Sequence, residues 1–431
     1  MKFIKILAVV SLFVSTICNA QFSFKNYALH HLNVVDVNSK QILKNHSIVI
    51  HDGTIINILP TRDYVNNDST QVIILKNKYV VPGLIDAHVH FATDPTKERR
   101  DNAEKVLKEM LLTGITSVRD MAGDARALAS LSRNTLVGDV DGPTIYYSAI
   151  MAGTRFFSDP RTIATAQGGV SGEMPYMKAI HSRSNLPLEI AQAKGTGAHG
   201  IKLYANLSAK EMSAIVKEAK KQEIPVWSHV SLRPTKPSEV IASKVISISH
   251  VNLFLDEKYT TDKKLIKKWS TYKGGKDSKI FWDKEFQKLD FSKIYELMKK
   301  NNVVLDATVT VLETYKKYPK HVWRYELGKR ITTDAYKNGV LIAAGSDSDQ
   351  KTFVQHEMKL LVKECGLSPF DALISATKYS AMATDIFNTE GSIEKGKKAN
   401  LLFLNKNPTT DVKNINDVYL VIKNGKFYNS K

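Results

Sequence analysis

The chain has 431 residues, and its 61 lysines and arginines against 43 aspartates and glutamates give a formal net charge of +18 at pH 7. Apolar residues make up 43% and charged residues 24%, which excludes collagenous, intrinsically disordered and small disulfide-stabilised proteins. This length accommodates one large domain with an appendage, or two to three domains. The positive charge leaves binding to nucleic acid or to an anionic membrane surface open until the charges are located.

Residues 1–20 have the layout of a secretory signal peptide. Lys2 and Lys5 precede the apolar run Ile6–Cys18, and the segment ends in small side chains before a cleavage site after Ala20. The run is shorter than the roughly 20 residues that cross a bilayer as a helix. We therefore expect an exported protein, periplasmic or secreted, without an integral membrane segment. Lipidation of Cys18 and a retained anchor are the alternatives.

Short β-like runs characterise both ends of the chain that would remain after cleavage. They occupy residues 21–80 and 391–431, with turn signals such as Asp52-Gly53 and Asn424-Gly425 between them. We expect the two ends to form one small β-sandwich domain together. The predicted strands are Ala28–Val35, Ser47–His51, Ile55–Leu59, Val72–Leu75, Ala399–Leu404, Val418–Lys423 and Lys426–Tyr428.

Strand and helix patterns alternate between residues 81 and 390. Eight predicted strands interleaved with helices favour an α/β fold, namely a (β/α)8 TIM barrel. An open doubly wound sheet is the alternative, but it typically shows a Gly-rich phosphate loop after its first strand, and none follows here. The predicted strands are Tyr79–His90, Ile115–Arg119, Thr144–Ser148, Gly200–Tyr204, Ile224–His229, Val245–His250, Val303–Thr308 and Val340–Asp347.

Polar side chains end five of these strands, where a barrel gathers its functional groups at one mouth. They are His88 and His90 on the first strand, Lys202 on the fourth, His229 on the fifth, His250 on the sixth and Asp347 on the eighth. Residues two apart in a strand face the same side, so His88 and His90 converge on one point. Such side chains are costly to bury unless they are paired or coordinated, and imidazoles with a carboxylate suit a divalent metal.

At these residues the sequence resembles the metal-dependent amidohydrolase superfamily, most closely its imidazolonepropionase-like and prolidase-like branch. The similar segments follow one another in order over nearly the whole chain. They are Val81–His90, Gly200–Tyr204, Ala344–Asp347, His356–Met358, Leu367–Ala376, Gly391–Ile393 and Gly396–Leu401. The resemblance implies an enzyme that hydrolyses an amide-type C–N bond of a small molecule. A dipeptide, an N-acyl amino acid or a cyclic amide would fit.

The resemblance also implies a role for each polar residue. His88, His90 and Asp347 would bind one metal, His229 and His250 would bind a second, and a carbamate formed on Lys202 would bridge them. Zinc is the first expectation for two such ions, with manganese, iron or cobalt as alternatives. Asp347 would take a proton from water and pass it to the leaving nitrogen. The alternatives are a single-metal, deaminase-like hydrolase with an ordinary salt-bridged lysine, and a non-catalytic basic binding protein without metal.

Two further side chains are candidates for binding the substrate. Tyr204 follows Lys202 by two positions, so it should face the same side of its strand. Arg155 lies on the long loop after the third strand and would suit a substrate carboxylate, although a solvated arginine is the alternative. Related prolidase-like sequences carry a histidine in this loop, and residues 151–176 contain none, which argues against a prolidase substrate. Arg119-Asp120, at the end of the second strand, is expected to form a structural ion pair.

Lysines cluster in residues 257–300, interleaved with aromatic side chains such as Trp269, Tyr272 and Trp282. Acidic residues interrupt this cluster and no nucleic-acid-binding motif accompanies it, so we expect a solvated insertion and no nucleic-acid partner. A lid over the barrel mouth is a second interpretation. The remaining positive charge favours an anionic small-molecule substrate, and a homo-oligomer stays open.

Overall fold

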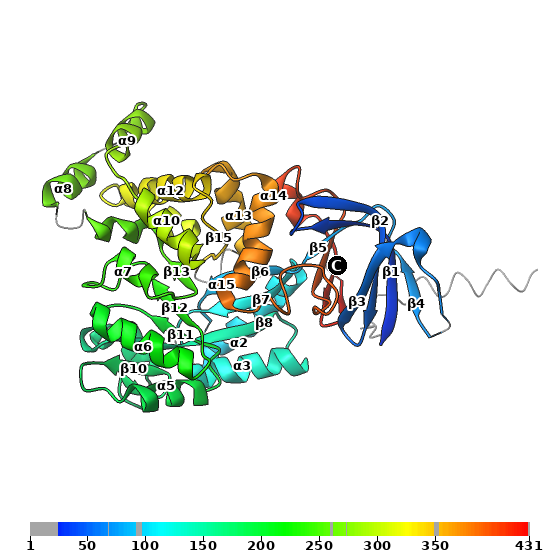
Figure 1. Cartoon of the computed structure of the whole chain (residues 1–431), viewed down its shortest axis with the longest axis horizontal. Helices are drawn as coiled ribbons and strands as arrows, with labels where there is room; N and C mark the ends of the chain where they lie inside the picture. Colours follow the sequence, from blue (N-terminus) through cyan, green and yellow to red (C-terminus); the bar gives the residue numbers. More distant parts are fainter. Residues whose placement is uncertain are drawn as a thin grey trace, which may run out of the picture.

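The computed structural model describes residues 25–67, 69–91, 97–258, 262–272, 274–348 and 353–429, so the predicted signal peptide lies outside the described residues. Figure 1 shows a helix-covered barrel beside a sheet that contains both ends of the described chain. The predicted fold class, a TIM barrel with a β domain built from both chain ends, is confirmed. Within the described ranges, no helix combines the length and the apolar character needed to cross a membrane.

Eight parallel strands form the barrel, and each pairs with the next one in chain order. They are β6 (Leu84–Val89), β7 (Ile115–Asp120), β8 (Thr144–Gly153), β11 (Gly200–Leu203), β12 (Val226–His229), β13 (Ser247–Ser249), β14 (Val304–Asp306) and β15 (Ile342–Ala343). The amide of Ala87 donates to the carbonyl of Ala344 at 3.0 Å, and the amide of Asp347 donates to that of His88 at 2.8 Å. These bonds connect the last strand to the first, which excludes an open doubly wound sheet.

Helices cover the outside of the barrel because each presents an apolar face to the strands. In α6 (Ala209–Lys221), Met212, Ile215 and Ala219 are buried at helical spacing, while Ser208 and Glu211 form a reciprocal capping box at its start. The other long helices are α2 (Lys97–Leu112), α3 (Ala125–Val137), α5 (Leu186–Gly195), α10 (Ser292–Asn301), α12 (Val322–Lys337) and α13 (Val354–Lys363).

The predicted first strand, Tyr79–His90, is two strands in the structure. β5 (Tyr79–Pro82) belongs to the small sheet, where it pairs with β16 (Leu401–Leu404), and β6 begins the barrel. Gly83 separates them, and a Cβ at this position would clash with the side chain of Thr116. Only glycine lets the chain pass so close to β7 as it crosses from the sheet into the barrel.

The small sheet has the strand order β18-β17-β16-β5-β1-β2-β3, and β4 also pairs with β1. The first half of β1 (Asn26–Asp36) pairs with β4 (Gln71–Ile74) and its second half pairs with β5. The remaining strands are β2 (Gln41–His51), β3 (Thr54–Pro60), β17 (Val418–Lys423) and β18 (Lys426–Tyr428). This sheet has its own apolar core, which includes Tyr27, Ile48 and Phe403.

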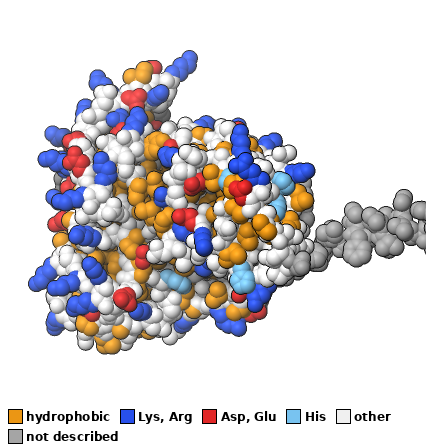
Figure 2. Space-filling model, turned by 45° about the vertical axis from the view of Figure 1, so that its right-hand side comes forward, with side chains coloured by type: hydrophobic (Ala, Val, Ile, Leu, Met, Phe, Trp, Pro, Cys, Tyr) orange, Lys and Arg blue, Asp and Glu red, His pale blue; other side chains and the backbone are white. Residues whose placement is uncertain are grey.

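The insertion after β13 contains α8 (Lys263–Thr271) and α9 (Ser278–Phe286), which project from the barrel on the side away from the small sheet (Figure 1). Its aromatic side chains contact each other, as in Trp269 against Phe286 at 5.3 Å between ring centroids, and Trp269 is fully buried. These rings form the internal core of the insertion rather than an exposed stacking surface. On the face shown in Figure 2, basic side chains are interspersed with acidic and apolar ones rather than gathered in one patch.

Lys423 of β17 connects the small sheet to the barrel through a buried ammonium group. Its Nζ donates to the carbonyl of Thr135 at 3.0 Å and to that of Gly142 at 2.7 Å. Burial lowers the pKa of Lys423 from 10.5 to about 8. Between these two values the unfolded chain holds a proton that the folded protein has released, so the folded state gains stability as the pH rises.

We therefore expect the free energy of unfolding of the wild type, relative to that of Lys423→Met, to rise by about 2–3 kcal/mol between pH 7 and pH 10. Urea denaturation of both proteins across this range measures the difference, because all other titrating groups are common to the two chains. A difference that stays constant with pH would show that Lys423 keeps its proton when the protein folds.

Candidate metal centre

The six predicted ligands converge at the C-terminal ends of the barrel strands. His88 lies in β6, Lys202 in β11 and His229 at the end of β12, and His250 directly follows β13. One potential ligand atom from each of His88, His250 and Asp347 lies within 4.8 Å of the other two. The sequence pattern therefore identified side chains that the fold brings together.

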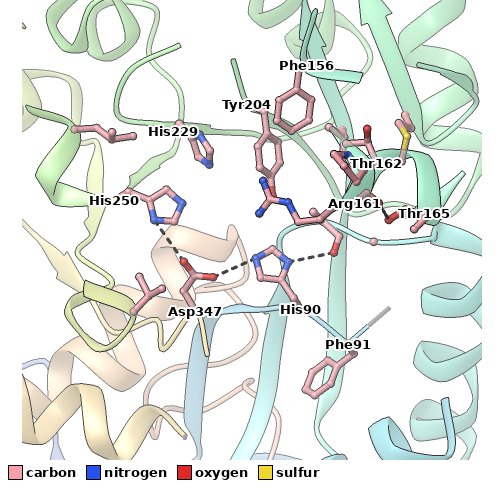
Figure 3. Close-up of a pocket in the computed structure, with 18 of the residues that line it drawn as sticks. His90, Phe91, Phe156, Arg161, Thr162, Thr165, Tyr204, His229, His250 and Asp347 are labelled. Carbon is pink, nitrogen blue, oxygen red and sulfur yellow. Dashed lines mark hydrogen bonds and ion pairs between the residues drawn. The ribbon is translucent and has the colours of Figure 1, made fainter. Parts of the chain in front are cut away.

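Asp347 is the central group of the cluster, with imidazoles on several sides (Figure 3). Its Oδ1 lies 3.3 Å from His90 Nε2 and 3.7 Å from His88 Nε2, and its Oδ2 lies 3.6 Å from His250 Nδ1. Burial opposes ionisation of Asp347, but the surrounding histidines outweigh it and hold the pKa of this carboxyl below its usual range. Asp347 is therefore an anion at neutral pH, as a metal ligand has to be.

His229 and His250 form the other side of the cluster, with their ring centroids 4.6 Å apart. Burial, followed by the charge of Lys202, lowers the pKa of His229 well below its ordinary value. Burial also lowers the pKa of His250 to about 3, against the opposing effect of Asp347. Both imidazoles are neutral at pH 7, which is the form that binds metal ions.

Three residues at these strand ends have backbone in the left-handed region. His250 has φ +75°, Thr308 has φ +52° and Asp347 has φ +44°, although none of them is glycine. Such conformations cost roughly 1–3 kcal/mol each and persist where the surrounding structure enforces them, most often at functional sites. Here they turn the backbone at the ends of three neighbouring strands toward the same point.

Lys202 is fully buried beneath the histidines, and its Nζ donates to Ser249 Oγ at 3.1 Å. Within the described ranges, no carboxylate lies at ion-pair distance from this ammonium group, so the expected alternative of a salt-bridged lysine is not seen. Burial, with the nearby charge of Arg119, lowers the pKa of Lys202 to about 7. A substantial share of the amine is therefore uncharged at neutral pH.

A buried ion pair that sequence reasoning missed lies below the cluster. Arg119 Nη2 is 3.4 Å from Asp306 Oδ2, and Arg119 also donates to the carbonyls of Ala87 at 2.7 Å and Ala383 at 2.6 Å. The expected pair between Arg119 and Asp120 is wrong. Neighbouring residues of a strand point to opposite faces, and Asp120 instead accepts the backbone amide of Phe91 at 2.6 Å.

Asp306 orients His88. Its Oδ2 lies 2.7 Å from His88 Nδ1 and also accepts a hydrogen bond from Ser249 at 2.9 Å. When a carboxylate accepts a hydrogen bond from Nδ1–H, the proton stays on Nδ1 and the lone pair of Nε2 is free to bind a metal ion. In His88, Nε2 is the atom that faces Asp347. Asp306 ends β14 and is thus found by the same strand-end rule that selected Asp347.

A cavity of about 760 Å³ opens above the cluster. Its lining includes His90, His229, His250 and Asp347 from the cluster, and Phe91, Ile150, Phe156, Met177, Leu253, Val311 and Leu312 as apolar walls. Tyr204 also lines it, with its hydroxyl donating to the carbonyl of Met121 at 3.1 Å. None of the described residues of the insertion 257–300 lines the cavity, so the structure gives no support to a lid.

The arginine of the loop after β8 that reaches this cavity is Arg161, and the structure places Arg155 elsewhere. Arg155 is exposed and is not among the lining residues, because it lies in the short turn of η2 (Thr154–Ser158) whose Phe156 faces inward. Arg161 in α4 (Pro160–Thr165) points toward Tyr204 and His90 (Figure 3). Its Nη2 lies 2.8 Å from Asp159 Oδ2, so an acidic neighbour balances its charge.

The donor set fits divalent metal ions. It consists of imidazoles and an ionised carboxylate without a thiolate, and zinc, manganese, iron and cobalt accept such nitrogen and oxygen ligands. Against the effect of burial, Asp347 raises the pKa of His90 to about 9, so this imidazole has to release a proton before it can bind a metal ion. The cluster lies at the base of a cavity, so a metal bound there would retain coordination positions for water or substrate. The buried pair below it supplies the hydrogen bond that metal-binding histidines commonly make through their second nitrogen.

Comparisons with known proteins agree with this architecture. The amidohydrolase family profile matches residues 79–428. Ochratoxinase of Aspergillus niger is 22% identical, in a match that covers 90% of this chain and 83% of the relative. A Xaa-Pro dipeptidase structure with bound methionine gives a TM-score of 0.73 at 23% identity, over 94% of this chain and 100% of that chain. The Aspergillus niger ochratoxinase structure gives 0.74 at 20% identity, over 95% and 96% of the two chains.

At these identities the superposed structures show the shared fold, whereas the family profile covers most of the sequence, including every residue of the cluster. The profile begins at the first residue of β5 and ends at the last residue of β18, so it contains the whole barrel and the last strands of the small sheet. The order of the strand-end motifs, the closed barrel and the profile lead to one conclusion. The chain belongs to the amidohydrolase family.

Proposed function

We propose that the protein is an exported, metal-dependent hydrolase that cleaves an amide-type C–N bond in a small molecule such as a dipeptide, an N-acyl amino acid or a cyclic amide. The observation that carries this proposal is the convergence of His88, His250 and Asp347, with ligand atoms within 4.8 Å of one another at the base of a cavity. The cavity volume of about 760 Å³ is that of a small-molecule site. The proposal of export rests on residues 1–20 alone, and determining the N-terminal residue of the processed protein would test it.

His88, His90 and Asp347 would hold one metal ion, and His229 and His250 a second, with zinc as the favoured metal. The chemistry that such ions supply when bound is the acidification of a water molecule and the polarisation of the scissile carbonyl. Asp347 lines the cavity and is anionic, so one of its oxygens would accept the proton of that water. The same carboxyl would then return the proton to the leaving nitrogen, while Tyr204 bounds the cavity beside the substrate.

Lys202 would contribute as a carbamate that bridges both ions. The neutral amine attacks carbon dioxide, a bond forms between Nζ and carbon, and the amine proton leaves to solvent, which yields an anionic carboxylate. The position that repels cations as an ammonium then attracts them. The lowered pKa of Lys202, about 7, supplies the uncharged amine that this step needs, and among the described residues no carboxylate ion pair competes for it.

Metal analysis of the purified protein tests this proposal. We expect about two zinc ions per chain for the wild type. After chelation, recovery of activity with zinc should require bicarbonate, as measured in a screen of dipeptides, N-acyl amino acids and lactams. Lys202→Ala should abolish the effect of bicarbonate, whereas Lys210→Ala, on the outer helix α6, should behave as the wild type does.

The other outcomes separate the alternative functions. One metal per chain with activity independent of bicarbonate would identify a single-metal, deaminase-like hydrolase. Absence of metal and of turnover, together with binding to an anionic polymer that survives chelation, would identify a non-catalytic basic binding protein. His88→Ala should remove both metal and turnover while the protein remains folded by circular dichroism.

A further inference from the structure

A second arginine, Arg324, lines the cavity across the barrel from Arg161. Arg161 follows β8 and Arg324 lies near the start of α12, after β14. These are the third and seventh strands of an eight-stranded ring, so the two segments rise from opposite sides of the barrel. The wall around Arg324 consists of Val311, Leu312 and Tyr315, which follow β14 as well.

The charge of Arg324 has no acidic partner within the described part of the chain, in contrast to that of Arg161. Arg161 pairs with Asp159, and Arg330 on the same helix as Arg324 pairs with Asp334 at 2.6 Å. Arg324 instead packs on aromatic rings, with its guanidinium carbon 5.5 Å from the ring centroid of Tyr315 and 4.8 Å from that of Trp323. Stacking of this kind positions a guanidinium group while leaving its N–H groups free to bind an anion.

The apolar surroundings of Arg324 strengthen the binding of an anion to its guanidinium group. Val311 and Leu312 lie on the same wall, and Trp323 beneath the guanidinium is buried. A hydrogen-bonded pair between a guanidinium and a carboxylate is worth more where water is excluded, and the planar fork of arginine matches the two carboxylate oxygens. An uncompensated arginine that faces such a cavity is therefore a receptor for an anionic group.

We propose that Arg324 binds the free carboxylate of the substrate. This inference rests on the proposed function and narrows it: the substrates are N-acyl amino acids or dipeptides, whose carboxylate lies against α12 while the scissile amide lies at Asp347. Neutral cyclic amides are disfavoured, because they would leave the charge of Arg324 unmatched in a partly apolar cavity. The residue that selects the substrate is thus on the wall after β14, rather than on the loop that carries Arg155.

Equilibrium binding tests the inference without requiring turnover. The probes are 2-benzyl-4-oxo-4-phenylbutanoic acid, in which a methylene group replaces the amide nitrogen of N-benzoylphenylalanine so that no scissile C–N bond remains, and its carboxamide; the two have nearly the same size and differ in charge. By calorimetry on the zinc-loaded wild type, we expect the acid to bind at least about tenfold more tightly than the amide. Arg324→Leu should reduce this preference to less than about twofold, and Arg324→Lys should restore part of it. Equal binding of both probes by the wild type, or binding of neither, would overturn the inference.

Two further variants separate a binding role from a structural one. Arg330→Leu changes an arginine on the same helix that is paired and lies outside the cavity, so it should keep the wild-type preference. Arg161→Leu tests the opposite wall: if this variant loses the preference and Arg324→Leu keeps it, the carboxylate lies after β8 and the inference is wrong. If the carboxylate preference is present but the metal-loaded protein hydrolyses no amide, the proposed function fails while the assignment of Arg324 stands.

Discussion

Asp347→Asn is expected to lower kcat by about 10²- to 10⁴-fold on whichever amide the wild type hydrolyses fastest. Asparagine preserves the size of the side chain but lacks the negative charge and the oxygen that accepts a proton. Three histidine nitrogens lie within 3.3 to 3.7 Å of the carboxylate, so its loss also removes the anion that holds this cluster together. Steady-state kinetics with metal analysis of the same sample measure both effects.

The matched control for this variant is Asp334→Asn on α12. Asp334 forms a half-buried pair with Arg330 and is not among the residues that line the cavity. Its replacement should leave kcat and metal content within about twofold of the wild type, because this pair lies outside the cavity and is partly open to solvent. If Asp347→Asn retained more than a fifth of the wild-type kcat, the proposed role of Asp347 in proton transfer would be wrong.

Much of the cluster could be predicted because strand periodicity and barrel topology are properties of local sequence. His88 and His90 face one side because they are two residues apart, and Asp347 joins them because parallel strands end at one mouth. Asp306 obeys the same rule on the seventh strand and was within reach of the same reasoning. Its partner Arg119 was not, since the length of an arginine side chain allows contact across the barrel with a strand distant in sequence.

The loops were less predictable for a different physical reason. Arg155 and Arg161 are both arginines of one loop, and no hydrophobic period indicates which of them faces inward. The local signal is Asp159-Pro160, an N-cap followed by proline at the first helical position, which begins α4. Arg161 lies in the first turn of this helix and pairs with its cap, so the start of α4 places its side chain in the cavity. The direction of that helix depends on packing that the sequence pattern does not contain.

The pair between Arg119 and Asp306 carries the second large expected effect, which is on stability. Both side chains are fully buried, and Arg119 has four partners: Asp306, the hydroxyl of Ser247 at 2.7 Å, and the carbonyls of Ala87 and Ala383. Arg119→Met would leave the charge of Asp306 buried without its guanidinium and would remove the three other hydrogen bonds that Arg119 donates. We expect this variant to lose about 3–5 kcal/mol in the free energy of unfolding, as measured in urea.

A second effect should accompany the loss of stability. Asp306 accepts the Nδ1 proton of His88, so an Asp306 that lacks its guanidinium partner would become easier to protonate and would hold that ring less firmly. We therefore expect weaker zinc binding in Arg119→Met, even at temperatures where the protein remains folded. Arg330→Met, which removes an arginine from a partly exposed pair, should cost less than about 1 kcal/mol and leave zinc affinity unchanged. Equal stability of the two variants would mean that the buried pair contributes no more than the partly exposed one.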